Sequence, residues 1–291
     1  MAIPYERIHI VINPAAGRDE PILNILNDVF KKYEVEWDVS ITHKYGDATR
    51  LAQAAVESGV DLVMGYGGDG TQMEVANGVM GSSVPLGILP GGTGNAMAFE
   101  LGISRDLGEA AEALCQSSKR RKIDVGQIGD HYFMLRAYTG IQPEQRVSRE
   151  TKDRFGFLAY SADVYHTIAP SVRPRYRLTI DGEEIEEEGF ICLIINAGSL
   201  GSVNVPTTQK IDVSDGLLDV FIVNNNISSL RALASFYADT GKAKAWVHHW
   251  QGREISVQPD PAQEIWIDGE SHGPTPFTAA VVPQALEVVV P

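Results

Sequence analysis

Hydrophobic and polar positions follow two alternating patterns along the first ~120 residues of the chain. Apolar runs or a period of two, which predict β-strands, occur at 7–12, 35–41, 60–66 and 86–90. Apolar side chains spaced three or four residues apart, which predict α-helices, occur at 21–33, 47–58, 72–80, 96–101 and 104–116. Strand and helix signals therefore take turns, and this order predicts an α/β domain with a parallel sheet and helices on both faces.

The pattern changes after the segment KRRKIDVG at 119–126, and strand signals dominate from there on. Helical spacing persists mainly at 144–168 and 228–240, and the acidic run 183–188 is expected to form a solvated hairpin tip. We place a domain boundary near 121–124, with an α/β domain at 1–122 and a mostly antiparallel β-sandwich domain at 123–291. The strands expected in the second domain are 122–128, 131–138, 175–181, 189–198, 217–224, 253–259, 264–268, 277–282 and 286–290.

Composition excludes several classes of function. The 291 residues carry 38 acidic against 24 basic side chains, a net charge of −14, which argues against non-specific binding to nucleic acid or to strongly anionic membranes. Cys115 and Cys192 have neither disulfide-framework nor zinc-site spacing, so a reducing cytoplasmic compartment fits. No apolar run approaches about 18 residues and the N-terminus has no signal-peptide pattern, so we expect any membrane association to be peripheral and transient. The oligomeric state stays open, with a homodimer among the states allowed.

A glycine-rich loop around one aspartate follows the third predicted strand. Gly65, Gly67 and Gly70 match the dinucleotide fingerprint G-x-G-x-x-G, but that fingerprint normally follows the first strand and needs an acidic residue roughly 20 residues later, which is missing here. No Walker A motif occurs. Consecutive glycines at a helix start instead allow backbone N–H groups to converge on an anion. The carboxylate of Asp69 fits beside phosphates if Mg²⁺ lies between them.

The alternative for this loop is a tight strand-to-helix turn, with Thr71 and Glu74 forming a T-x-x-E capping box. Two further loops favour a ligand site. The segments NPAAGR at 13–18 and LPGGTGN at 89–95 also follow predicted strands. Because the carboxyl ends of parallel strands meet at one edge of a sheet, we expect the three loops to gather there, where ligands bind in such folds.

Together these segments resemble the diacylglycerol kinase catalytic-domain family, which includes sphingosine and ceramide kinases and bacterial lipid kinases. The matching segments run in family order over nearly the whole chain, at 13–17, 67–78, 90–98, 215–220 and 268–270. The resemblance implies an α/β nucleotide domain and a β-rich lipid-acceptor domain with the active site in the cleft. It also implies a lipid kinase that transfers the γ-phosphoryl group of ATP, with Mg²⁺, to the hydroxyl of a diacylglycerol-like lipid at a membrane surface.

The resemblance assigns residues to three roles. Asp69 would organise the Mg²⁺–phosphate assembly, and Asp268 or Glu270 would take the proton from the lipid hydroxyl; we prefer Glu270, but the sequence leaves both open. A second, structural Mg²⁺ would be held by the Asp215 side chain and the carbonyls of Asp212 and Leu217. Taken alone, 215–216 and 268–269 also read as ordinary turns. The expected nucleotide-binding residues are Asn13, Pro14, Ala15, Ala16, Gly17, Arg18, Thr42, Gly67, Gly68, Asp69, Gly70, Thr71, Glu74, Gly92, Thr93 and Asn95.

Two departures from the family pattern bear on the acceptor. Ala96 stands where many bacterial lipid kinases have an acidic residue, and 138–143 differs from the family's usual glycine-rich segment. The segment RFGFL at 154–158 is a candidate lipid contact, or the start of a core helix. The functions that stay open besides a diacylglycerol-type kinase are a sphingoid-base or other lipid kinase, an NAD kinase and a non-catalytic nucleotide-binding regulator.

Overall fold

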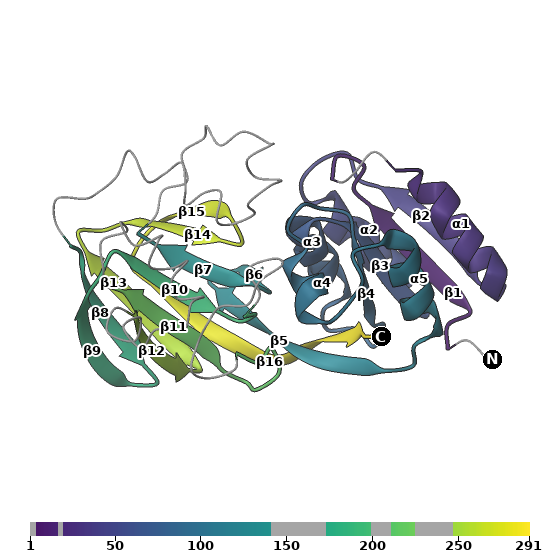
Figure 1. Ribbon diagram of the computed structural model, residues 1–291. Helices are drawn as coiled ribbons and strands as arrows, with labels where there is room; N and C mark the ends of the chain where they lie inside the picture. The colour runs from purple at the N-terminus through teal and green to yellow at the C-terminus, as the bar shows by residue number, and fades with distance from the viewer. Residues whose placement is uncertain (1–3, 17–19, 141–172, 199–210, 225–246) are drawn as a thin grey trace, which may run out of the picture. The chain divides into compact units, whose positions relative to one another are not determined.

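The computed structural model describes residues 4–16, 20–140, 173–198, 211–224 and 247–291 (Figure 1). The chain forms two compact units, each described by itself below. Unit 1 comprises Met1–Asp124 and Gln284–Pro291, and unit 2 comprises Val125–Pro283. We expected the second domain to run to the end of the chain, whereas Gln284–Pro291 belongs to unit 1.

Unit 1 contains a parallel sheet, as the alternation of strand and helix signals predicts. The strand order is β2-β1-β3-β4, with every neighbouring pair parallel, and Val288 near the end of β16 (Phe277–Val289) pairs with Leu86 of β4. Pairing of Ile12 with both Ile41 and Tyr66 aligns the carboxyl ends of the first three strands. The strands are β1 (Arg7–Ile12), β2 (Glu36–Ile41), β3 (Leu62–Gly67) and β4 (Leu86–Pro90).

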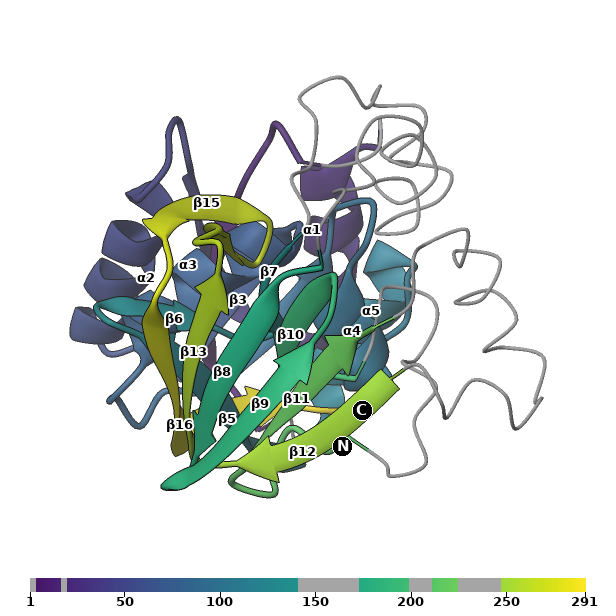
Figure 2. The same ribbon diagram turned by 90° about the vertical axis from the view of Figure 1, so that its left-hand side faces the viewer.

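Helices cover both faces of this sheet. The helices are α1 (Ile22–Tyr33), α2 (Asp47–Glu57), α3 (Asp69–Val79), α4 (Ala96–Glu100) and α5 (Leu107–Gln116). Helix α1 packs against α5 and α2 against α3, and the two pairs lie on opposite faces (Figures 1 and 2). A Cβ atom built on Gly78 of α3 would lie 2.4 Å from the carbonyl oxygen of Thr49 and 2.6 Å from the Cβ atom of Ala52. Gly78 therefore allows the close approach of α2 and α3.

The described residues of unit 2 form two antiparallel sheets. The first contains β16, β13, β8 and β9 in that order, together with β5 and β6; the second has the order β12-β11-β10-β7-β14-β15 (Figure 2). This arrangement confirms the predicted β-sandwich. The strands are β5 (Arg120–Ile128), β6 (His131–Phe133), β7 (Arg136–Thr139), β8 (Arg175–Ile180), β9 (Glu183–Glu188), β10 (Ile191–Ile195), β11 (Leu218–Val223), β12 (Val247–Gly252), β13 (Glu254–Asp260), β14 (Glu264–Ile267) and β15 (Glu270–Pro274).

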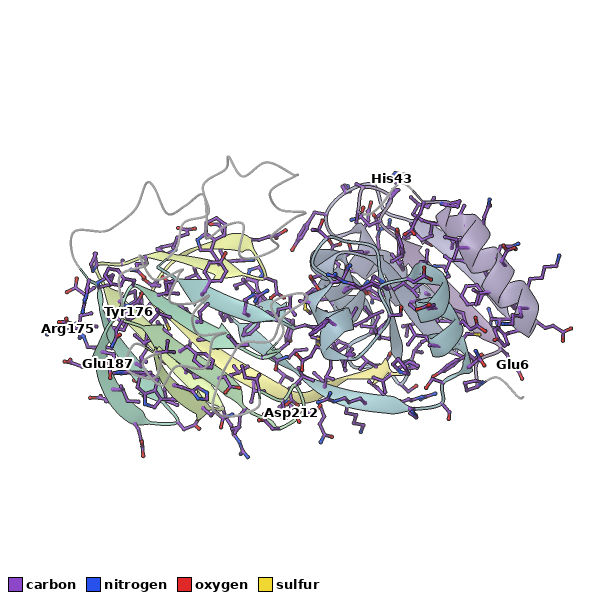
Figure 3. All side chains as sticks on the ribbon, viewed as in Figure 1. Glu6, His43, Arg175, Tyr176, Glu187 and Asp212 are labelled. Carbon is purple, nitrogen blue, oxygen red and sulfur yellow. The ribbon has the colours of Figure 1, made fainter. Side chains whose placement is uncertain are left out.

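The core of unit 2 lies between its two sheets. Tyr176 and Ile255 of the first sheet and Ile194, Val220 and Ile267 of the second belong to one buried cluster. Strand periodicity explains this division, because successive side chains point to opposite faces of a sheet. The side chain next to Tyr176, Arg175, is accordingly exposed (Figure 3).

The acidic run 183–188 is a strand, so its interpretation as a hairpin tip is wrong. Strand β9 pairs with β8 over its whole length, and the tip of the hairpin is Asp181-Gly182. Both tip residues have positive φ values, 48° and 90°, which a tight two-residue hairpin turn requires.

Several sequence predictions lie outside the described residues. They are the helical segments 144–168 and 228–240, the segment 154–158, residues 141–143 of the altered acceptor segment, and Gly17 and Arg18. Within the parts of the chain that the structure describes, no helix has the length and apolar character needed to cross a bilayer.

Candidate functional site

The carboxyl edge of the unit 1 sheet carries the loops that the sequence singled out. Asn13, Thr42 and Asp69 follow the ends of β1, β2 and β3. Backbone hydrogen bonds connect these strand ends. The N–H of Thr42 donates to the Ile12 carbonyl at 2.9 Å, and the N–H of Asn13 donates to the Tyr66 carbonyl at 3.0 Å. The structure thus brings these predicted residues to one edge.

Asn13 ties the first loop to helix α3. Its side-chain Nδ2 donates to Oγ1 of Thr71 at 2.9 Å, while its Oδ1 accepts from the N–H of Ala15 at 3.0 Å. Pro14 and Ala15 are exposed, and Ala16 is half-buried. The asparagine side chain therefore fixes the loop from inside, and its neighbours face solvent.

Most glycines in the loops after β3 and β4 are required by the fold itself. A Cβ atom on Gly67 would lie 2.5 Å from the Cβ of Thr71, and one on Gly92 would lie 2.5 Å from the Cα of Gly68. The N–H of Gly91 also donates to the Gly67 carbonyl at 3.0 Å. The two loops therefore meet backbone to backbone at Gly91 and Gly92, and a side chain fits at neither Gly67 nor Gly92.

Gly70 has no such internal reason to be glycine. A Cβ atom at this position would meet nothing within 4 Å, and its φ lies outside the left-handed region that favours glycine. It is exposed in the first turn of α3. The absence of a side chain at Gly70 leaves room outside the protein, where a ligand could approach the backbone.

The Asp69 carboxylate lies between the starts of α3 and α4. Asp69 is the first residue of α3, and Gly68 precedes it as the N-cap residue. The Asp69 Oδ1 accepts from the N–H of Met97 at 3.2 Å. A Cβ atom on Gly94 would lie 3.2 Å from the Asp69 Oδ2, so a side chain at Gly94 would crowd the carboxylate. The fold thus holds a half-buried anionic group beside glycine-rich backbone.

Asn95 holds the loop before α4 in shape. Its backbone has a φ of 51°, a left-handed conformation that Asn adopts more readily than most residues. Its Oδ1 accepts from the N–H of Gly92 at 2.9 Å and its Nδ2 donates to the carbonyl of the same residue at 2.6 Å. The Asn95 side chain is buried, whereas Thr93 in the same loop is exposed.

Glu74 caps a different helix from the one that the capping-box alternative required. Its Oε2 accepts from the N–H groups of Gly46 at 2.8 Å and Ala48 at 3.2 Å, at the start of α2. Because α3 begins at Asp69, Thr71 lies inside its first turn rather than at the cap. The T-x-x-E capping box is therefore not formed.

Two residues that support this edge were not predicted as site residues from the sequence. Gln72, which is 2% exposed, donates through Nε2 to the carbonyls of Gly65 at 2.8 Å and Leu89 at 3.1 Å. Tyr66 donates from its hydroxyl to Oε1 of Glu20 at 2.8 Å. Gln72 joins the ends of β3 and β4, and Tyr66 anchors the chain after the first loop. In the sequence, each is marked only as a polar residue in or beside a short apolar run.

In unit 2, Asp268 and Gly269 form the turn between β14 and β15. Their φ values of 45° and 97° fit a tight hairpin turn, so the turn interpretation of this dipeptide is confirmed. The Asp268 carboxylate accepts from the N–H groups of Arg136 at 2.9 Å and Met134 at 3.2 Å. It therefore fixes the start of β7, while Glu270, the first residue of β15, is exposed.

The loop before β11 contains the expected structural cation ligands. The Asp212 Oδ1 accepts from the N–H of Ser214 at 3.1 Å, and the Asp215 Oδ1 accepts from the N–H of Leu217 at 3.0 Å (Asp212 is labelled in Figure 3). Gly216 has a φ of 76°, so this segment is a turn as well. No cluster of three His, Cys, Asp or Glu side chains suited to a metal occurs among the described residues. One carboxylate and two carbonyls in a short turn are nevertheless oxygen donors of the kind that Mg²⁺ prefers.

Known proteins match both parts of the chain. The model described as "Diacylglycerol kinase catalytic domain" matches residues 7–128, and that described as "YegS C-terminal NAD kinase beta sandwich-like domain" matches residues 137–290. "Putative lipid kinase SAS0691" of Staphylococcus aureus (strain MSSA476) is 32% identical over 237 residues, covering 79% of this chain and 77% of its own. "Putative lipid kinase SH2167" of Staphylococcus haemolyticus is 29% identical over 249 residues, covering 82% and 80%.

Solved structures share the fold. A putative diacylglycerol kinase from Bacillus anthracis strain Sterne superposes with a TM-score of 0.85 at 23% identity, covering 100% of this chain and 99% of its own. A second structure of a diacylglycerol kinase from the same strain gives a TM-score of 0.78 at 22% identity. Together with the family models and the sequence relatives, the two-unit fold shows that the chain belongs to the diacylglycerol kinase catalytic-domain family, in the branch that ends in a β-sandwich-like domain of the NAD kinase type.

Proposed function

We propose that this protein is a lipid kinase that transfers the γ-phosphoryl group of ATP, with Mg²⁺, to the hydroxyl of a diacylglycerol-like lipid at a membrane surface. Family membership supports the reaction class, and the names of the sequence relatives support a lipid acceptor. The single observation that carries the proposal is the Asp69 carboxylate, fixed by the N–H of Met97 beside glycine-rich backbone at the carboxyl edge of a parallel sheet.

Unit 1 would bind the nucleotide. The backbone N–H groups at the start of α3 and the exposed surface at Gly70 suit the phosphates, because helix N-termini and glycine-rich loops attract anions. A carboxylate alone would repel those phosphates. Asp69 therefore fits as a Mg²⁺ ligand, and bound Mg²⁺ would supply neutralisation of the phosphate charge. Asn13, Thr93 and Asn95 would shape the surrounding loops, Asn13 and Asn95 through the hydrogen bonds described above.

Unit 2 would supply the base. We assign this role to Glu270, because it is exposed, whereas both carboxylate oxygens of Asp268 accept backbone hydrogen bonds. Glu270 would take the proton from the acceptor hydroxyl as that oxygen bonds to phosphorus. Asp268 would hold the turn that positions it. Asp215, with the carbonyls of Asp212 and Leu217, would hold a structural Mg²⁺ in the loop before β11.

An acceptor panel tests the function directly. The full-length protein is incubated with MgATP and dispersed diacylglycerol, monoacylglycerol, sphingosine or NAD⁺, and products are identified by mass spectrometry. We expect phosphatidic acid from diacylglycerol. Phosphorylation of sphingosine alone would redirect the acceptor, and NADP⁺ would indicate an NAD kinase. Tight MgATP binding without turnover of any acceptor, including a total lipid extract, would support a nucleotide-binding regulator instead.

Replacing Gly70 by Ala is expected to weaken MgATP binding without weakening the fold. The added methyl group meets no protein atom within 4 Å, and alanine favours a helix over glycine by up to roughly 1 kcal/mol. The same methyl group would occupy the space through which phosphates reach the first turn of α3. We expect the Kd for MgATP to rise at least about tenfold, which corresponds to about 1.4 kcal/mol, with an unchanged or higher Tm.

Gly78→Ala in the same helix is the matched control for Gly70→Ala. Its methyl group would collide with the backbone of α2, so we expect a loss of about 1–3 kcal/mol in unfolding free energy. MgATP affinity of the folded protein should stay near the wild-type value. If Gly70→Ala bound MgATP as tightly as the wild type, the phosphates would have to bind elsewhere.

A further inference from the structure

Two histidines meet near Glu270, one from each sheet of unit 2. His131 is the first residue of β6 in the first sheet, and His272 lies on β15 in the second. Their ring centroids are 4.3 Å apart, with the ring planes inclined by 59°. His131 is exposed and His272 is half-buried. The pair therefore extends from solvent to the strand that begins with Glu270.

Glu270 and His272 are two residues apart on β15, so their side chains project to the same side of the strand. Residues spaced in this way are roughly 7 Å apart along the backbone, a distance that two long side chains or one water molecule can bridge. The negative charge of Glu270 acts on His272 and favours its protonated form. This coupling indicates that the two groups are electrostatic neighbours.

His272 presents a neutral imidazole, which can accept a proton from a carboxylic acid. Burial lowers its pKa, the neighbouring His131 lowers it further, and Glu270 acts in the opposite direction. The net decrease leaves the imidazole neutral, with a basic ring nitrogen. Two other carboxylates of this hairpin have partners: Glu264 on β14 accepts from the hydroxyl of Ser271 and the N–H of Gly273, and Asp268 accepts from the backbone of β7.

We propose that His272 receives from Glu270 the proton of the acceptor hydroxyl and that His131 passes it to solvent. The inference rests on the proposed function. In the transfer step, the acceptor O–H bond breaks, its oxygen bonds to the γ-phosphorus, and ADP leaves. The proton moves to the Glu270 carboxylate, then to a ring nitrogen of His272, which regenerates the carboxylate for the next turnover. No oxidant or further reactant is needed.

The test uses His272→Gln and His131→Gln, with His248→Gln as the control. His248 lies on β12 of the same unit and pairs with Glu187, so it tests the loss of a histidine outside the relay. The assay measures kcat and KM for diacylglycerol and MgATP at neutral pH, with and without added imidazole, and Tm reports folding. We expect His272→Gln to lower kcat by about tenfold with both KM values unchanged, and imidazole to restore much of the loss.

We expect His131→Gln to lose less activity, also with recovery in imidazole, and His248→Gln to match the wild type. A kcat within twofold of wild type for His272→Gln, or a loss that imidazole does not restore, would overturn the relay. An unchanged kcat for His131→Gln would remove His131 from it. If His272→Gln lowers Tm, His272→Asn is assayed by the same imidazole criterion. A wild-type protein that phosphorylates no lipid would contradict the proposed function itself, which separates the two failures.

Discussion

Replacement of Asp69 by Asn is expected to lower kcat for lipid phosphorylation by about 10³-fold or more, because phosphoryl transfer depends mainly on neutralising and positioning the phosphates. Asn has the shape of Asp and can still accept the N–H of Met97 through its side-chain oxygen. The substitution therefore removes the negative charge while keeping the contact that positions the side chain. Steady-state kinetics at saturating MgATP measures the loss, and calorimetry with and without Mg²⁺ measures nucleotide binding.

Asp106→Asn is the matched control for Asp69→Asn. Asp106 is also a carboxylate at a helix start in unit 1, where its side chain accepts from the N–H of Glu109 at 2.9 Å and caps α5. Its replacement removes the same charge from another helix N-terminus, so we expect at most a small loss of stability and wild-type kcat. If Asp69→Asn kept kcat within tenfold of the wild type, Asp69 could not organise the metal–phosphate assembly.

Strand positions in unit 1 were predictable because apolar runs end sharply. The predicted segments 7–12 and 86–90 coincide with β1 and β4, since each run ends where the polar or glycine-rich loop begins. The start of α3 was not predictable in this way. Glycines have no hydrophobic pattern, so the helix signal began at 72, three residues after Asp69, the first residue of the helix. The glycines belong to the helix start because Gly68 takes the N-cap conformation.

Strand β9 shows why charge can hide a strand. The run 183–188 contains one apolar residue, Ile185, so the period of two was not visible. In the structure, Arg175 and Arg177 of β8 face Glu188 and Glu186 across the pair. Opposite charges on neighbouring strands stabilise such a pair. The stabilising partner, β8, lies outside the segment 183–188, so the segment alone could not show it.

The candidate site was predictable in its placement and unpredictable in its side-chain partners. Parallel strand direction follows from the alternation of helices and strands, which is why the loops after β1, β3 and β4 could be expected at one edge. The partners of Glu74 and Asp268 depend on contacts with distant segments, at Gly46 and Arg136 respectively. The residues next to Glu74 and Asp268 in the sequence do not indicate those contacts. The sequence therefore could not distinguish a carboxylate that accepts backbone hydrogen bonds from one that faces solvent.

Glu270→Gln and Asp268→Asn should have opposite main effects, which distinguishes the proposed base from the residue that holds its turn. Glu270 is exposed, so its neutral replacement should leave Tm unchanged. A general base contributes 10²- to 10⁴-fold to a rate, so we expect kcat to fall by about that factor in Glu270→Gln, with the KM for MgATP unchanged. Kinetics with diacylglycerol and thermal unfolding of the same preparations measure both quantities.

Asp268→Asn should mainly lower the stability of the fold. The Asp268 carboxylate accepts the N–H groups of Arg136 and Met134 with separate oxygens, whereas an amide has one acceptor oxygen and one donor group. One backbone N–H would lose its acceptor and face a donor, so we expect unfolding free energy to fall by about 1–3 kcal/mol. We expect kcat of the folded variant to fall less than in Glu270→Gln, because the base itself remains. The reverse pattern, a stable Asp268→Asn without activity and an active Glu270→Gln, would make Asp268 the base, and the histidine relay that starts from Glu270 would then have no donor.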